Sequence, residues 1–198
     1  MTSRVIRLNI AGSEAKWENV GIKFPPSKVR DLNGVDVALV ECDLGPNVGL
    51  EIAGLNSESV VARGVTACNE LTHGVRCNDG IGITTIDHIM VRARNAEEFL
   101  RHFSKVSGAP IVEDVNGERS VWISGIRFDS IPTLDLDVDA EVWGIAFRVQ
   151  NLTHAASFLG SDLLGEVKSA RQEGDLVAVI RSSAGLGVPV ALVGHKIY

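Results

Sequence analysis

The chain has 198 residues, of which 45% are hydrophobic and 22% are charged, and its formal net charge is −6. This length fits one compact domain or two small ones, and the composition is typical of a globular protein. The negative charge argues against a broad nucleic-acid-binding surface. No apolar run reaches the roughly 18 residues that a membrane-spanning helix needs, so we expect no membrane partner.

The cysteine content and the first residues indicate the compartment. The sequence has 3 cysteines, an odd number, and residues 1–7 lack the apolar core of a signal peptide. We therefore expect a cytoplasmic protein with free thiols rather than a disulfide framework. Cys68, His73 and Cys77 provide too few ligands for structural zinc and no paired C-x2-C knuckles, so we interpret this stretch as a loop.

The N-terminal part of the chain predicts short strands. In residues 5–10, apolar side chains alternate with polar ones, which is typical of a half-buried strand. Residues 34–42 and 47–55 predict two further strands, and residues 13–20 predict one or two turns of helix. Residues 56–82 are polar and contain glycine, which indicates a connection between two units.

The pattern becomes sharper from residue 83 onward. Residues 86–93 predict a strand, after which Asn95 caps a helix and Glu98 completes a pair that resembles a capping box. The buried stripe of this helix follows at helical spacing: Phe99, Phe103 and Val106. Two more strands are predicted near residues 119–123 and 126–130.

The sequence contains an internal repeat. The unit at 139–198 repeats the unit at 83–138, because residues 143–148 line up with residues 87–92 and the helix cap then falls on Asn151. Both units are predicted to contain a strand, a helix and two or three further strands. We interpret residues 1–58 as a third, degenerate copy, joined to the others by residues 59–82.

These motifs resemble the glyoxalase, bleomycin-resistance and extradiol-dioxygenase superfamily, also called the vicinal oxygen chelate family. The segments that carry the resemblance are IDHIMV at 86–91, NAEEFL at 95–100, GIAFRV at 144–149 and GLGVPVALV at 185–193. The resemblance is closer over residues 83–195 than over the first 55. It implies an α+β fold of paired βαβββ modules whose mixed sheet curls around a cleft.

The resemblance also implies a divalent metal, since the first and last strands of such modules present His, Gln or Glu into the cleft. His88 stands at the first-strand position, and strand parity places His88, Met90 and Arg92 on one face. Glu51 stands at a last-strand position. We therefore expect His88 and Glu51 to be both the metal ligands and the catalytic residues.

The last copy departs from this ligand pattern. Gly144 stands at its first-strand position and Ala191 at its last-strand position. Two histidines and one carboxylate in matching positions, as iron oxygenases use, are therefore not visible. This argues against a ring-cleaving dioxygenase and against a four-ligand site.

Four further residues are candidates for binding the substrate. Arg92 and Arg148 stand at equivalent positions of the repeat and would bind a carboxylate or phosphate, unless they line a sheet edge in water. Trp122 and Trp143 would form apolar walls. His88 has its own alternative as a structural or substrate-binding histidine, since the sequence shows no partner that would orient it.

The resemblance implies an enzyme that acts on a small oxygenated molecule. Because the ligand set is incomplete, proton transfer or lyase and isomerase chemistry fits better than dioxygen activation. The alternative is a protein of the same fold that holds a small molecule without chemistry, as antibiotic-sequestering members do. No dinucleotide or P-loop motif is present, so no nucleotide cofactor is expected. An odd number of modules would expose strand edges, which favours a homodimer.

Overall fold

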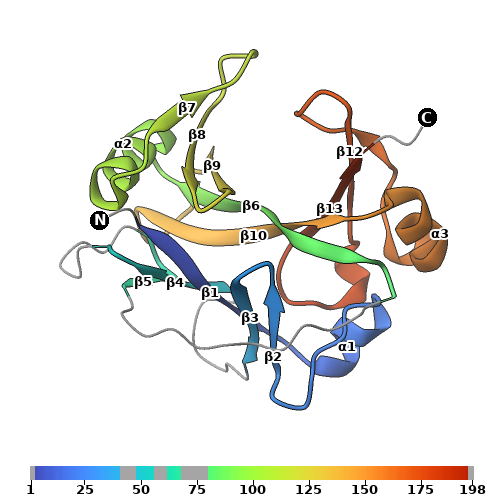
Figure 1. The fold of residues 1–198 in the computed structure, drawn as a ribbon. Coiled ribbons are helices and arrows are strands. Elements are labelled where there is room, and N and C mark those ends of the chain that lie inside the picture. Colours follow the sequence, from blue (N-terminus) through green and yellow to red (C-terminus); the bar gives the residue numbers. More distant parts are fainter. Residues whose placement is uncertain (1–2, 41–47, 56–61, 68–79, 196–198) are drawn as a thin grey trace.

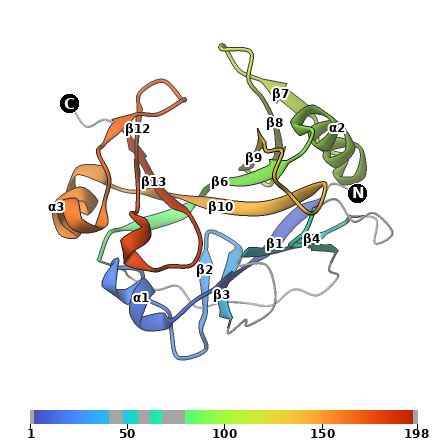
Figure 2. The same cartoon turned by 180° about the vertical axis from the view of Figure 1, so that it is seen from behind.

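The computed structural model describes residues 3–40, 48–55, 62–67 and 80–195. Within these residues the chain forms a five-stranded sheet and an eight-stranded sheet, together with helices that lie outside both. The larger sheet curls into a trough, and the smaller sheet packs against its outer side (Figure 1, and from behind in Figure 2). The predicted α+β class is therefore confirmed.

One half of the larger sheet is a βαβββ module. Its elements are β6 (Ile83–Ala93), α2 (Ala96–Ser107), β7 (Ile111–Glu113), β8 (Arg119–Ile123) and β9 (Ile126–Pro132). The last strand, β9, returns parallel to β6, while β8 pairs antiparallel with β9 and β7 with β8. The first and last strands of the module are therefore neighbours.

The other half repeats this arrangement. Its elements are β10 (Ala140–Val149), α3 (Leu152–Leu163), β11 (Lys168–Ser169), β12 (Asp175–Val179), the short 3-10 helix η1 (Ser182–Ala184) and β13 (Val190–His195). β13 runs parallel to β10, and β10 pairs antiparallel with β6 at the centre of the sheet. The repeat found in the sequence thus forms two paired βαβββ modules, as the resemblance implied.

The N-terminal sheet differs from the single degenerate module expected over residues 1–58. Its elements are β1 (Arg4–Ala11), α1 (Glu14–Asn19), β2 (Val29–Leu32), β3 (Val35–Val40), β4 (Val48–Ala53) and β5 (Val65–Ala67), in the sheet order β2-β3-β1-β4-β5. The strand that returns parallel to β1 is β3, and β4 pairs antiparallel with the other edge of β1. β4 is therefore not the last strand of a module.

The pairing directions of this sheet repeat those at the middle of the larger sheet. Each neighbouring pair in β2-β3-β1-β4-β5 has the same direction as its counterpart in β8-β9-β6-β10-β13. The smaller sheet thus shares the strand directions of the middle of the larger sheet, and its last strand comes from the segment expected to be only a connection. The homodimer expected from exposed strand edges stays a prediction.

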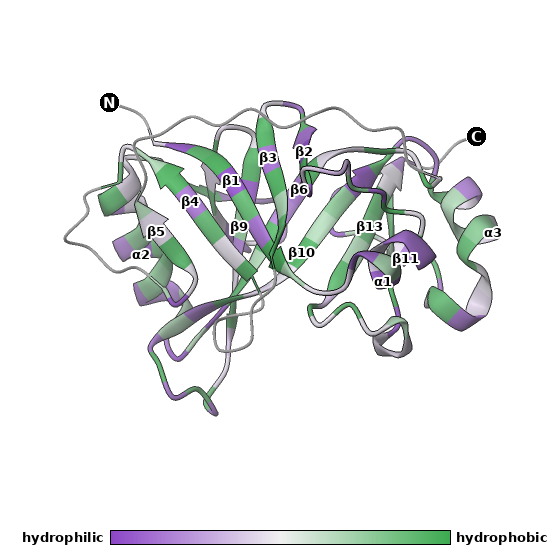
Figure 3. Cartoon of the chain, turned by 90° about the horizontal axis from the view of Figure 1, so that it is seen from below, coloured by the Kyte–Doolittle hydropathy of each residue, from purple (hydrophilic) through white to green (hydrophobic). Residues whose placement is uncertain are grey.

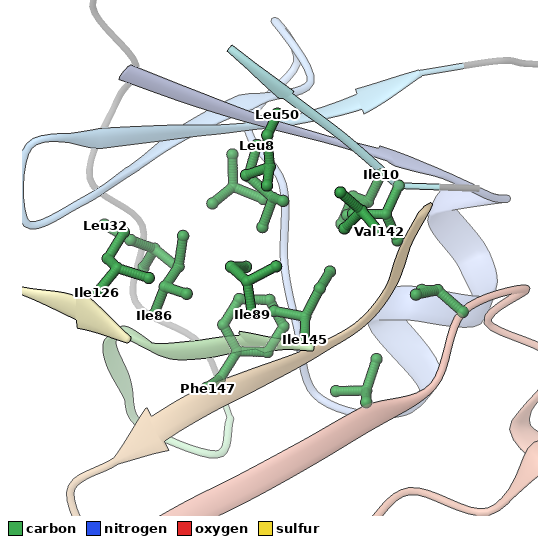
Figure 4. Packing of buried hydrophobic residues seen from close by; sticks show 14 of the residues in the cluster. Leu8, Ile10, Leu32, Leu50, Ile86, Ile89, Ile126, Val142, Ile145 and Phe147 are labelled. Carbon is green, nitrogen blue, oxygen red and sulfur yellow. The ribbon is translucent and has the colours of Figure 1, made fainter. Parts of the chain in front are cut away.

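The two sheets bury their facing sides against each other. Leu8 of β1 and Leu50 of β4 point toward Ile89 of β6 and Ile145 of β10, and each of the four is at most 1% exposed (Figure 4). Hydrophobic and hydrophilic residues follow one another in bands along β1 and β4 of the smaller sheet (Figure 3). Because successive side chains of a strand point to opposite faces, the sequence neighbours of these four residues point away from the core.

Helix α2 begins as the sequence predicts. Asn95 Oδ1 accepts a hydrogen bond from the backbone N–H of Glu98 at 3.1 Å, and Gly108 ends the helix in the left-handed region at φ 68°. Phe103 packs edge-on against Phe128 of β9, with ring centroids 5.0 Å apart. Among the residues that the structure describes, no helix is long and apolar enough to cross a membrane.

We expect Asn95→Ala to lower the free energy of unfolding by about 1 kcal/mol, because the N–H that Asn95 caps loses its acceptor. Urea denaturation followed by circular dichroism measures this change. Asn116→Ala, an exposed position in the β7–β8 hairpin, is the matched control and should stay within about 0.5 kcal/mol of the native chain. Equal losses in the two variants would contradict the prediction.

Candidate functional site

A pocket of about 650 Å³ opens on the concave side of the larger sheet, opposite the N-terminal sheet. This volume suits a small organic ligand. Helix α2, the tip of the β7–β8 hairpin and the segment before β12 form its walls. The residues of its floor are Asp87, His88 and Met90 of β6, Arg127 and Asp129 of β9, Val177 of β12 and Val193 of β13.

His88 lies on the floor of this pocket. Its neighbour Ile89 is fully buried in the core between the sheets, so His88 points to the opposite, concave face. The sheet register pairs His88 with Arg127 on one side and with Ala146 on the other. The parity argument from the sequence is therefore confirmed for this strand.

A β-bulge brings Asp87 to the same face as His88. The pairing of β6 with β10 passes from His88–Ala146 to Ile86–Phe147, which leaves Asp87 as an extra residue. Asp87 Oδ2 consequently lies 2.8 Å from His88 Nδ1. In a regular strand these neighbours would point to opposite faces, so periodicity alone gave no sign of this partner.

The contacts of His88 define which ring nitrogen faces a ligand. Asp87 accepts a hydrogen bond from Nδ1, which fixes the ring orientation and favours the tautomer with its proton on that atom. Nε2 makes no hydrogen bond to any residue that the structure describes, and the imidazole lines the pocket at 14% exposure. Nε2 is therefore the atom that meets a molecule in the pocket.

The guanidinium of Arg148 is hydrogen-bonded to the carboxylate of Asp87. Arg148 Nε donates to Asp87 Oδ1 at 2.8 Å, and Arg148 Nη2 donates to Asp175 Oδ2 at 2.8 Å. Burial raises the pKa of Asp87, but the hydrogen bond from His88 and the charge of Arg148 outweigh it and hold that pKa below its usual value. Asp87 is therefore a carboxylate at neutral pH.

The two arginines expected to bind the substrate form ion pairs with side chains of the protein itself. Arg148 is bonded to two buried carboxylates, and Arg92 forms an ion pair with Glu141. Arg92 also lies over the ring of Trp143, 5.5 Å from its centroid. Neither arginine lines the pocket. A role in binding substrate directly therefore finds no support in the geometry.

The tryptophans expected as pocket walls lie outside its lining. Trp143 lies beneath Arg92, and Trp122 Nε1 donates to Ser120 Oγ at 3.2 Å. Trp122 pairs with Arg127, so it lies on the concave face but beside the pocket. The apolar part of the lining instead includes smaller side chains such as Met90 and Val193.

The arginines that line the pocket were missed in the sequence. They are Arg119, Arg127 and Arg171. A signal was available for Arg127, since it alternates with buried Ile126 and Phe128 and must therefore face the other side of its strand. Arg119 and Arg171 do not stand at equivalent positions of the repeat, so the repeat did not indicate them as site residues.

Arg171 joins the two modules across the pocket. Its Nε lies 2.5 Å from Asp114 Oδ2 and 2.7 Å from Glu118 Oε2, both in the β7–β8 hairpin. Its Nη1 reaches Asp129 Oδ1 at 3.4 Å. The hydrogen bond from Arg171 is the main cause that holds the pKa of Asp114 below its usual value. These contacts tie the two arms of the trough together.

Glu51 lies on the far side of the molecule from His88. Glu51 accepts a hydrogen bond from Asn9 Nδ2 at 2.9 Å and lies 3.7 Å from Arg7 Nη1, on the outer face of the smaller sheet. Its neighbour Leu50 points into the core between the sheets. Both sheets therefore separate the two residues, and the structure does not bring together the pair expected to bind metal and carry out catalysis.

Comparisons with known proteins address the fold. No protein-family model matches the sequence, and no curated protein matches it. A solved xylose isomerase-like TIM barrel/4-hydroxyphenylpyruvate dioxygenase fusion protein aligns over 98% of this chain and 49% of its own, with a TM-score of 0.59 and 10% identity. The chain has a glyoxalase-type fold.

Other solved structures align over a smaller part of this chain. Methylmalonyl-CoA epimerase from Mycobacterium tuberculosis covers 58% of this chain and 90% of its own, at 17% identity and a TM-score of 0.47. The Streptomyces coelicolor methylmalonyl-CoA epimerase in complex with 2-nitronate-propionyl-CoA covers 59% and 100%, at 16% identity and a TM-score of 0.42. At such identities a likeness concerns the fold alone.

The metal that the glyoxalase-type fold implies does not fit the residues around His88. The adjacent strands bring Arg127 and Ala146 beside it, and Ala191 follows next to Ala146. At Gly144, the other ligand position, the Met90 side chain occupies the space beside the backbone, because a Cβ added to Gly144 would lie 2.6 Å from Met90 Cε. No group of three or more His, Cys, Asp or Glu that could hold a metal occurs in the described parts of the chain.

The predicted loop with Cys68, His73 and Cys77 lies outside the described residues.

Proposed function

We propose that this protein is an enzyme that transfers a proton on a small oxygenated organic molecule, with His88 as the general base and acid. The observation that carries this proposal is the Asp87–His88 pair on the pocket floor, with Nδ1 held at 2.8 Å and Nε2 left for a ligand. Histidine is the side chain that most often moves protons at neutral pH, and an orienting carboxylate supports it in that role.

In this mechanism, His88 Nε2 removes a proton from a carbon next to a substrate carbonyl. The electron pair of the broken C–H bond forms a carbon–carbon double bond, and the carbonyl π electrons move to oxygen to give an enolate. Asp87 stabilises the imidazolium that results. Return of the proton from His88 to another atom completes an isomerisation, and delivery of a solvent proton to the opposite face of the carbon completes an epimerisation. Departure of a leaving group from the β-carbon, with the electron pair of its bond, completes a lyase reaction.

The charge of the pocket limits the substrate class. Three arginines and four carboxylates line it, and each arginine contacts at least one acidic side chain: Glu97 with Arg119, Asp129 with Arg127, and Asp114, Glu118 and Asp129 with Arg171. Such a lining attracts a polyanion only weakly. It supports a neutral ketone, or a molecule with one carboxylate, as the substrate.

Proton exchange with solvent tests the proposal without knowledge of the product. The protein is incubated in D2O with a panel of small ketones and oxo acids, and mass spectrometry follows deuterium uptake against the rate in buffer alone. We expect at least one compound to exchange faster with the native protein, and His88→Gln to lower that acceleration by about 100- to 10,000-fold.

His154→Gln is the matched control, because His154 is exposed on α3 and lies outside the pocket. It should exchange deuterium at the native rate. Exchange by His88→Gln at the native rate would exclude His88 as the acid and base.

A binding protein is the second candidate function. Ala146, Ala191 and Val193, with Val177 against them, form a small apolar cluster on the concave face, separate from the main core. Such a surface supports retention of an apolar ligand without chemistry. Compounds that raise the thermal unfolding temperature of the protein but take up no deuterium would favour this function over the enzyme.

A further inference from the structure

Arg127 places a positive charge beside His88. Arg127 Nη2 lies 3.3 Å from His88 Nδ1, and Arg127 Nε donates to Asp129 Oδ2 at 2.9 Å. The Arg127 side chain is 8% exposed, and arginine carries a positive charge in proteins. A fixed cation is therefore part of the pocket floor.

One nitrogen of this guanidinium is left for a ligand. Nε is bonded to Asp129 and Nη2 faces His88, whereas Nη1 has no hydrogen bond to any described residue. The guanidinium is planar, so the hydrogen bond from Nε to Asp129 also fixes the direction of Nη1. Because Arg127 lines the pocket, Nη1 is a preorganised donor beside the imidazole.

We propose that Arg127 is a catalytic residue, which donates from Nη1 to the substrate oxygen that becomes negative as His88 removes the adjacent proton. This inference rests on the proposed function of His88. The guanidinium stabilises the enolate oxygen, while the proton moves to His88 Nε2 and later returns to carbon. Since alanine stands at 146 and 191 and a cation stands at 127, the donor set beside His88 suits this arginine and not a divalent metal.

A metal titration tests the inference independently of any substrate. Isothermal titration of Zn²⁺ and of Mn²⁺ into the purified protein should give the same heats for the native chain and for His88→Gln. One metal ion bound per native chain, and lost in His88→Gln, would overturn the inference. Where exchange is found, the native rate should be unchanged by EDTA and should not rise with either metal.

Substitution of Arg127 tests the donor itself. We expect Arg127→Gln to lower deuterium exchange by about 100- to 1,000-fold, the effect of removing one donor to a developing oxyanion. Arg127→Lys keeps the charge without the planar fork, so its rate should fall between those of the native chain and Arg127→Gln. Arg101→Gln, at an exposed arginine of α2 outside the pocket lining, should exchange at the native rate. Circular dichroism checks that each variant is folded.

The outcomes separate this inference from the proposed function. Loss of exchange in His88→Gln, with native exchange in Arg127→Gln, would overturn the role of Arg127 and leave His88 as the base. If Arg127→Gln does not fold, a native rate in Arg127→Lys overturns the inference, and an intermediate rate supports it. Native exchange in His88→Gln overturns the proposed function.

Discussion

Replacement of Asp87 by asparagine is expected to slow proton exchange by about 100- to 10,000-fold. An asparagine amide carries no charge to stabilise the imidazolium of His88, and its NH2 group can donate to Nδ1 and so favour the wrong tautomer. The side chain keeps its size, so the pocket should keep its shape. Asp87 is thus expected to act as a positioning residue through His88.

Two measurements check this prediction. The first is the rate of deuterium uptake by the compound that the native protein exchanges. The second is the tautomer of the His88 ring from nitrogen-15 NMR, which a merely structural role of Asp87 would leave unchanged. Asp162→Asn, at an exposed position in α3, is the control. A native exchange rate together with a native tautomer in Asp87→Asn would rule out the positioning role.

Replacement of Arg148 by methionine should lower the free energy of unfolding at pH 7 by about 3–5 kcal/mol, because it leaves buried carboxylates without their shared cation. The side chains of Asp87 and Asp175 are only 8% and 4% exposed, and both are bonded to Arg148. Urea denaturation measures the loss. Arg101→Met, an exposed arginine on α2, should change it by no more than about 0.5 kcal/mol.

The decrease in unfolding free energy caused by Arg148→Met should become smaller as the pH is lowered. In the native protein the pKa of Asp87 is below its ordinary value, so its stabilising contribution is present above about pH 4 and is lost as the pH falls through the folded-state pKa. In the variant, the burial that raises this pKa is no longer offset by Arg148, so protonation stabilises the folded state. A difference in unfolding free energy that is equal at pH 7 and at pH 4 would contradict this explanation.

Local patterns in the sequence predicted the parts of the fold that depend on near neighbours. The period of two in a strand placed His88 and Met90 on the face opposite Ile89, and the Asn95 cap located the start of α2. The repeat of one motif at a constant offset predicted that the second half of the chain forms two equivalent modules. These features are determined by residues a few positions apart, so they can be read in a single sequence.

The site depended on strand pairing, which no local pattern specifies. The extra residue in β6 is defined only by its pairing with β10, and it turned Asp87 toward His88. Arg127 became the neighbour of His88 because β9 returns beside β6. Glu51 was separated from His88 because the N-terminal sheet packs against the larger sheet with Leu50 in the core, which leaves Glu51 on the outer face. The sequence by itself thus determined which face each strand buries, whereas the choice of neighbouring strand and register, made by contacts distant in sequence, decided which side chains meet.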